Sequence, residues 1–199
     1  GRQDPEGSVE GAQALRAAAP RRAGAAVKAA ILGLGLIRRC WAMVFARRGH
    51  QVVLWDQDPS QAEKALAHIA RTLPEMAESG LVDDAAAVGS RISGVSSLAD
   101  ALGGVDFIQE NIVERAEPKQ ALFAEVERLA PADAIISSST SAIMPSIIFG
   151  GLGTRHRCLV SHPLNPPHLA PIRELCGSDF TVPDAISRAG DFMAGCVGA

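Results

Sequence analysis

The feature that most constrains the fold is an apolar run, Val27 to Leu32, that enters the turn Gly33-Leu34-Gly35. A helical pattern follows over residues 36–48, and a second apolar segment at 51–55 ends at Asp56. Strand, glycine turn, helix and strand in this order predict a βαβ unit with an acid about twenty residues beyond the glycines. A tight turn that binds nothing would use the same glycines, but the terminal acid favours a binding site.

A βαβ unit of this kind is typical of adenine dinucleotide binding. Gly33 permits the sharp turn, and Gly35 lets the backbone approach a pyrophosphate, whose charge is stabilised by the amide groups at the start of the helix. Asp56 is expected to bind the adenosine ribose and to repel a 2′-phosphate, which favours NAD over NADP. Arg38 stands where the fingerprint has a third glycine, and we expect it to weaken NAD binding without abolishing the fold.

The composition of the 199 residues is that of a globular chain, with 47% hydrophobic and 21% charged residues. A formal net charge of −3 gives no electrostatic reason to expect a nucleic acid or an anionic membrane as partner. The four cysteines are widely spaced, so they indicate neither a metal site nor a disulfide framework, and we expect reduced thiols in the cytoplasm. Residues 1–26 are rich in Ala, Arg and Gly, so we interpret them as a flexible leader and residues 27–199 as one domain.

The rest of the chain alternates between helical and extended patterns. Pro59 opens a helix that Asp58 is expected to cap and that Ser79-Gly80 ends. Further strands are expected at 91–95, 105–112, 134–137 and 158–161, and further helices at 97–102, from Pro118, at 146–149 and at 183–196. This alternation predicts an α/β fold with a doubly wound, mainly parallel sheet of the Rossmann type.

Sheets of this type bind ligands at the carboxyl ends of their strands, so the polar residues expected there are candidates for a site. These candidates are Asp56, Glu114, Lys119, the hydroxyl residues 139–141, His162 and Asn165. We interpret Glu110 as an ordinary strand residue, and Lys119 has the alternative of a solvated charge at a helix start. Convergence of so many strand ends is hard to explain by packing alone.

Two of these positions suggest chemistry. His162 opens a segment whose prolines are expected to stiffen the loop, and Glu174 follows twelve residues later. A carboxylate bonded to one imidazole nitrogen would fix the tautomer and suit the pair to general acid and base catalysis, although a histidine after a strand also serves structural roles. The hydroxyl cluster has two interpretations. Either one of its hydroxyls holds a substrate oxygen, or Ser141 caps the helix near Pro145.

Three motifs together resemble a known family. They are Gly-x-Gly-Leu-Ile followed by Trp41-Ala42-Met43, Ser-Ser-Ser-Thr-Ser-x-x-Met-Pro-Ser at 137–146, and His-Pro-x-Asn-Pro-Pro at 162–167. They resemble the lambda-crystallin or L-gulonate 3-dehydrogenase family, a branch of the 3-hydroxyacyl-CoA dehydrogenase superfamily. The three-proline form of the last motif favours this branch over the fatty-acid oxidation enzymes.

The resemblance implies roles for individual residues. Ser141 is the substrate-binding hydroxyl, His162 the catalytic base and Glu174 its partner. The implied NAD contacts are Leu36, Ile37, Asp56, Glu114 and Lys119, with Asn165 near the nicotinamide and the substrate.

The activity that the resemblance implies is NAD-dependent oxidation of the 3-hydroxyl of a small hydroxy acid such as L-gulonate. One alternative substrate is a 3-hydroxyacyl-CoA, which would need basic contacts for its phosphates. Another alternative is a non-enzymatic NAD-binding or structural protein. Family members continue into a helical second domain that closes the crevice and forms a homodimer, and since the chain ends at Ala199 we expect the nucleotide domain alone.

Overall fold

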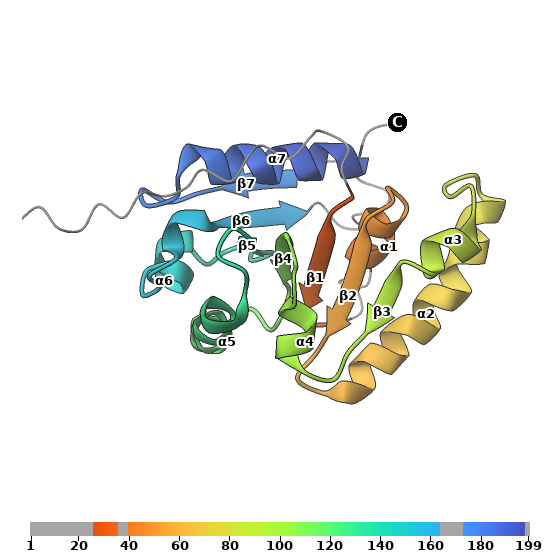
Figure 1. Ribbon diagram of the computed structural model, residues 1–199, viewed down its shortest axis with the longest axis horizontal. Coiled ribbons are helices and arrows are strands. Elements are labelled where there is room, and N and C mark those ends of the chain that lie inside the picture. Colours follow the sequence, from red (N-terminus) through yellow and green to blue (C-terminus); the bar gives the residue numbers. More distant parts are fainter. Residues whose placement is uncertain (1–25, 36–39, 164–172, 198–199) are drawn as a thin grey trace, which may run out of the picture.

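A seven-stranded sheet forms the centre of the computed structural model, which describes residues 26–35, 40–163 and 173–197. The strand order is β3-β2-β1-β4-β5-β6-β7, and every neighbouring pair is parallel except β6 with β7 (Figure 1). The strands are β1 (Lys28–Leu32), β2 (Gln51–Trp55), β3 (Ile92–Gly94), β4 (Phe107–Glu110), β5 (Ile135–Ser138), β6 (Cys158–Pro163) and β7 (Arg173–Cys176). The predicted mainly parallel sheet is confirmed.

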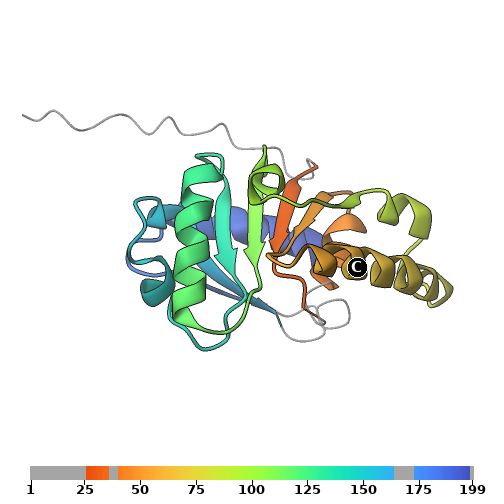
Figure 2. The same cartoon turned by 90° about the horizontal axis from the view of Figure 1, so that it is seen from below.

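Helices cover both faces of this sheet (Figure 2). Helices α1 (Cys40–Ala46), α2 (Pro59–Glu78), α3 (Ala85–Gly89) and α7 (Pro183–Val197) share one hydrophobic core, and α4 (Leu98–Leu102), α5 (Ala116–Leu129) and α6 (Pro145–Phe149) share the other. In β1, Ala29 and Ile31 face the first core while Ala30 and Leu32 face the second. A strand buried on both faces has to be continuously apolar, which explains the run that opens the domain.

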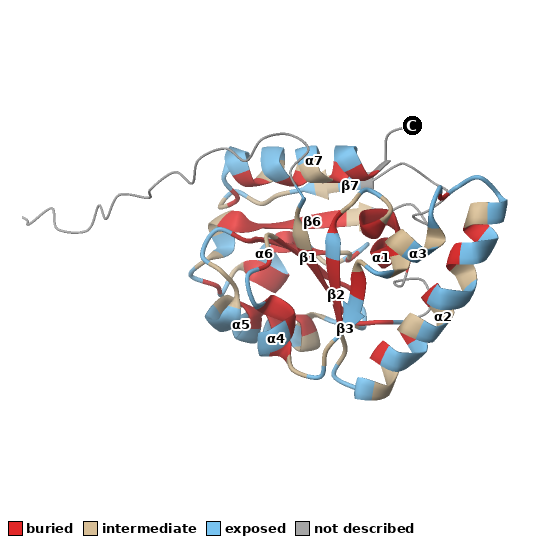
Figure 3. Ribbon diagram, turned by 45° about the vertical axis from the view of Figure 1, so that its right-hand side comes forward, coloured by how far each residue is buried: buried red, intermediate tan, exposed pale blue. Residues whose placement is uncertain are grey.

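Burial follows this layering. Strands in the middle of the sheet consist mostly of buried residues, whereas the outward sides of α2 and α7 are exposed (Figure 3). Local signals set the helix ends as expected: the Asp58 carboxylate accepts a hydrogen bond from the Ser60 amide at 3.0 Å, and Gly80 after α2 has a φ of 70°. The predicted cap and stop of α2 are therefore confirmed.

The sheet changes its winding direction beside β1. From β1 the chain builds outward through β2 and β3, then returns to place β4, β5 and β6 on the other side of β1. In doubly wound sheets a ligand crevice lies at such a switch point, outside the carboxyl ends of the strands. The glycine turn that follows β1 lies at this point.

Three of the described elements were not predicted. One is the 3-10 helix η1 (Arg155–Arg157), which directly precedes β6. Another is α3, a five-residue helix between α2 and β3 whose N-cap is Asp84. Strand β7 is antiparallel to β6 and covers only four residues, Arg-Glu-Leu-Cys, without an alternating pattern. The proposed leader lies in residues 1–26, of which only Ala26 is among the described residues.

Candidate functional site

Gly33 forms the turn after β1 and could not be another residue without strain. Its φ is +87°, and its amide donates to the Trp55 carbonyl at 2.9 Å. A Cβ at this position would lie 2.8 Å from backbone atoms of Asn111 and Ile112. The glycine therefore lets the chain leaving β1 pass directly against the chain leaving β4. Gly35 is exposed at the same edge.

Asp56 is tied to this turn. One carboxylate oxygen accepts from the Leu34 amide at 2.7 Å, and the other accepts from the Asp58 amide at 3.0 Å. Each carboxylate oxygen has two lone pairs, so Asp56 keeps capacity for ligand hydroxyl groups. A glycine turn without room for a Cβ and a partly exposed acid fixed beside it fit the adenosine end of a dinucleotide.

Glu110 and Lys119 form an ion pair beneath the same edge. Their side chains are 0% and 1% exposed, and the Lys119 Nζ lies 2.7 and 2.9 Å from the two Glu110 oxygens. Glu110 also accepts hydrogen bonds from the Ser138 hydroxyl and the Ile112 amide. Burial raises the pKa of the Glu110 carboxyl, and the Lys119 charge and these hydrogen bonds oppose that rise. Glu110 is the last residue of β4, as interpreted, and its burial in an ion pair was not predicted. The alternative of a solvated charge for Lys119 is wrong.

Glu114 holds the loop that carries the hydroxyl cluster. One of its oxygens accepts from the Thr140 hydroxyl, from the Ser141 amide at 2.9 Å and from the Ala142 amide at 3.3 Å. Burial raises the pKa of the Glu114 carboxyl, but these hydrogen bonds and the Lys119 charge outweigh it and lower the pKa overall. Ser141 is exposed, and Met144 takes the N-cap position of α6, so the capping alternative for Ser141 is wrong.

His162 and Glu174 are neighbours across β6 and β7. The strand pairing places them directly opposite each other, with 4.0 Å between the His162 Nδ1 and the Glu174 Oε2. That distance is too long for a hydrogen bond, so the expected bonded pair is a pair in electrostatic contact. The imidazole is 27% exposed and the carboxylate 79% exposed.

The predicted convergence of strand ends is present in the sheet. Strands β2, β1, β4, β5 and β6 are consecutive and parallel, so their carboxyl ends share one edge. Three strand spacings put β6 about 14 Å from β1. Because side chains alternate along a strand, His162 is on the same face of the sheet as Val160, Ser138 and Glu110.

Four residues named in the sequence analysis lie outside the described residues: Leu36, Ile37, Arg38 and Asn165.

The opposite face carries a buried polar row that was not predicted. The Gln109 amide nitrogen donates to the Ser161 carbonyl at 3.2 Å, and the Ser137 hydroxyl lies 2.7 Å from the Gln109 Oε1 and 2.9 Å from the Ile108 carbonyl. The available signal was a polar residue at the same inward position of two adjacent strands. The row connects β4, β5 and β6 just below the site.

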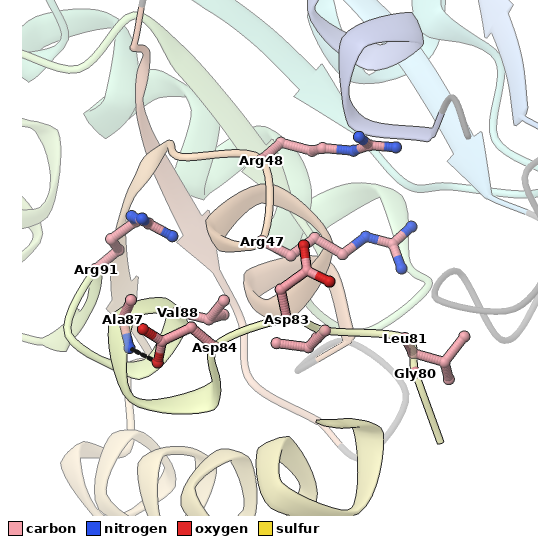
Figure 4. Close-up of a pocket in the computed structure, with 10 residues that line it drawn as sticks. Arg47, Arg48, Gly80, Leu81, Asp83, Asp84, Ala87, Val88 and Arg91 are labelled. Atoms are coloured by element: carbon pink, nitrogen blue, oxygen red, sulfur yellow. Dashed lines mark hydrogen bonds between the residues drawn. The ribbon is translucent and has the colours of Figure 1, made fainter. Parts of the chain in front are cut away.

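A cavity of about 410 Å³ lies at the other edge of the sheet, beside the amino ends of β2 and β3 (Figure 4). Three arginines line it, and the side chains of Arg47 and Arg48 extend away from Arg91. Asp84 is occupied in capping α3 through the Ala87 amide at 2.9 Å. The charged groups do not converge on one point, and the cavity is separate from the strand ends described above.

Neither a metal site nor a membrane span is found in the part of the chain that the structure describes. No cluster of three or more His, Cys, Asp and Glu residues there is arranged to hold a metal ion. None of the described helices has both the length and the apolar character needed to cross a bilayer.

The fold and the glycine turn with its acid define a dinucleotide-binding domain. Residues 28–198 match the family described as 3-hydroxyacyl-CoA dehydrogenase, NAD binding domain, and the chain belongs to that family. The cofactor prediction, NAD, is thereby confirmed for the family.

Curated proteins with similar sequences are consistent with membership of this family. The lambda-crystallin homolog of Bos taurus is 38% identical over 162 residues, which cover 80% of this chain and 50% of that protein. The L-carnitine dehydrogenase of a Pseudomonas species is 37% identical over 160 residues, covering 80% and 49%. The predicted resemblance to the lambda-crystallin branch is confirmed, and the chain spans about half the length of the curated relatives it matches.

Among solved structures, the 3-hydroxybutyryl-CoA dehydrogenase of Escherichia coli K12 superposes with a TM-score of 0.82. The alignment covers 86% of this chain and 37% of that one, at 24% identity. At that identity the likeness concerns the fold, and it confirms the predicted Rossmann-type architecture.

Proposed function

We propose that the chain is the NAD-binding part of an oxidoreductase that oxidises the 3-hydroxyl of a small hydroxy acid. The observation that carries this proposal is that β5 and β6 bring Ser141 and His162 to the edge of the sheet that holds Gly33 and Asp56. A hydroxyl and an imidazole beside a dinucleotide site are the groups that alcohol oxidation needs. The relatives named lambda-crystallin homolog and L-carnitine dehydrogenase support it.

The proposed cofactor contacts follow the edge of the sheet. Asp56 binds the adenosine ribose, Gly33 and Gly35 shape the turn at the pyrophosphate, and Glu114 lies toward the nicotinamide half. Lys119 acts through Glu114, since its own ammonium is buried. The remaining proposed contacts are Leu36, Ile37 and Asn165. When bound, NAD supplies the hydride acceptor.

In the proposed reaction the substrate hydroxyl loses its proton to His162 and its carbon loses a hydride, so that the hydroxyl becomes a ketone. Ser141 binds the reacting oxygen through its exposed hydroxyl. Glu174, 4.0 Å from the imidazole, stabilises the imidazolium that forms. The positive imidazolium and the negative carboxylate would then be neighbours of opposite charge.

The decisive variant is His162→Ala. Loss of the general base is expected to reduce turnover by about 10²–10⁴-fold, while the dissociation constant for NADH stays the same. His68→Ala on α2 serves as the control and should change neither quantity. Turnover is measured as the rate of NADH formation with L-gulonate, L-carnitine or 3-hydroxybutyryl-CoA as substrate. A His162→Ala protein that turns over at the wild-type rate would remove the assignment.

The same assay separates two other functions. The family description favours a 3-hydroxyacyl-CoA as the second candidate substrate, and preference for the CoA thioester over both free acids would select it. Tight NADH binding with no turnover on any of the three would select a non-enzymatic NAD-binding or structural role. The proposed partner is the small-molecule substrate. The resemblance implies a homodimer formed through the second domain of family members, so no dimer is proposed for the nucleotide domain alone. A cytoplasmic location stays a prediction.

A further inference from the structure

The loop after β5 is held almost entirely by side chains. Its four amides from 140 to 143 all donate to side-chain oxygens: Thr140 to the Ser138 hydroxyl at 3.2 Å, Ser141 and Ala142 to Glu114, and Ile143 to the Thr140 hydroxyl at 3.0 Å. Apart from the Ser139 amide, which donates to the Glu110 carbonyl at 2.9 Å, the loop depends on these side-chain acceptors for its position. Ser141 lies in the middle of this stretch.

These acceptors are all connected, directly or through another side chain, to one buried cation, the Lys119 ammonium. The Ser138 hydroxyl, which receives the Thr140 amide, itself donates to Glu110. Glu114, which receives the next two amides, lies 3.5 Å from the Lys119 Nζ. Lys119 therefore joins the two carboxylates on which the loop depends.

Neither member of the central pair is able to touch a ligand directly. The side chains of Glu110 and Lys119 are 0% and 1% exposed, whereas Glu114 is 39% exposed. A buried ion pair is weak evidence for stability, because apolar side chains of similar volume often stabilise a core equally well. The position of the pair, between the glycine turn and the hydroxyl loop, points to a different use.

We propose that Glu110 and Lys119 are positioning residues, which hold the loop 138–143 so that the Ser141 hydroxyl stays in place for the substrate. This inference rests on the substrate-binding role proposed for Ser141. The pair is close to neutral overall, so it fixes Glu114 without adding charge to the edge where the dinucleotide lies. The Glu110 side chain also holds the Ile112 amide, the backbone group that packs against Gly33. One carboxylate thus connects the turn after β1, the loop after β5 and α5.

The test neutralises both members together. A single substitution leaves an unpaired buried charge and risks unfolding the domain, so the variant is Glu110→Gln with Lys119→Met. The matched control is Arg115→Met with Glu117→Gln, an exposed ion pair of 3.9 Å whose side chains are 70% and 77% exposed. Both proteins lose one positive and one negative charge from neighbouring segments, and only the first loses the connection to the loop.

Amide hydrogen exchange is the first readout. The buried-pair variant should exchange the amides of residues 140–143 roughly tenfold faster or more, with β1 and α2 unchanged, and the control should match the wild type. Unchanged protection of these amides in a folded variant overturns the inference, whatever the activity.

Kinetics is the second readout. We expect kcat to fall about 100-fold, as for a small misplacement of a reacting group, which is more than any rise in the NADH dissociation constant that follows from loss of the Lys119 contact with Glu114. Adding Ser141→Ala to the buried-pair variant should cost little more, because both changes remove the same contact. In an active protein, an unchanged kcat, or a rise in the NADH dissociation constant as large as the fall in kcat, overturns the inference. If the wild type turns over none of the substrates but the variant loses loop protection, the proposed function fails and the positioning role stands.

Discussion

Replacing Gly33 by alanine tests whether the turn after β1 is set by backbone conformation or by close packing. Two glycines in the domain share a φ of +87°, Gly33 and Gly49. A Cβ on Gly33 would meet three backbone atoms within 2.9 Å, whereas a Cβ on Gly49 would meet nothing within 4 Å. The variant Gly49→Ala is therefore a control for the conformational cost alone.

The expected destabilisation follows from these two contributions. An alanine in the left-handed region costs about 1–2 kcal/mol in either variant. Forcing a Cβ into the backbone of residues 111 and 112 adds about 1–3 kcal/mol, the usual cost of overpacking. Gly33→Ala should therefore lose about 2–5 kcal/mol, or about 4–20 °C in Tm for a domain of this size. Gly49→Ala should lose about 2–8 °C.

Thermal and urea unfolding of the two variants beside the wild type provide the measurement, and NADH titration adds a functional comparison. Gly33→Ala is expected to bind NADH more weakly, since the displaced turn moves the Leu34 amide from Asp56, and Gly49→Ala is expected to bind normally. Equal losses of Tm in the two variants would refute the argument, because the close approach to the chain after β4 would then contribute nothing.

Two further predictions concern single groups. Asp56→Asn should raise the dissociation constant for NADH about tenfold, the loss of one charge-assisted hydrogen bond, and should narrow the preference for NADH over NADPH; an unchanged preference in paired titrations would argue against the ribose contact. Burial lowers the pKa of His50, whose neutral Nδ1 accepts the Val27 amide at 3.2 Å, so the free energy of unfolding should be constant above the unfolded-state pKa of about 6.5 and decrease as the pH falls below it. Urea unfolding across this range should show a shallower slope for His50→Gln than for the wild type, and identical slopes would place the titration elsewhere.

The parts of the fold that were predictable depend on local patterns. The run before Gly33 is apolar at every position because β1 is buried on both faces, and the acid after β2 marks the end of the βαβ unit. Asp58 with Pro59 specified the start of α2 through a cap that is formed by neighbouring residues. Such signals need no knowledge of distant contacts.

The parts that were missed depend on contacts between distant segments. Glu110 and Lys119 are ordinary surface residue types, and their burial follows from the way the first turns of α5 lie over the end of β4. Strand β7 pairs with β6 after an intervening segment and has no alternation of its own. In both cases the structure is decided by contacts with another segment of the chain. The sequence of one segment alone does not reveal such contacts.

The buried polar row of Gln109, Ser137 and the Ser161 carbonyl also favours a single alignment of three neighbouring strands. Strands β4, β5 and β6 are parallel, so no hairpin turn sets their alignment. If one strand slid by a single residue, its amide or hydroxyl would turn to the other face, where an unpaired polar group costs about 1–3 kcal/mol. A shifted alignment is therefore less stable than the native one, and a wholly hydrocarbon sheet would not impose this penalty.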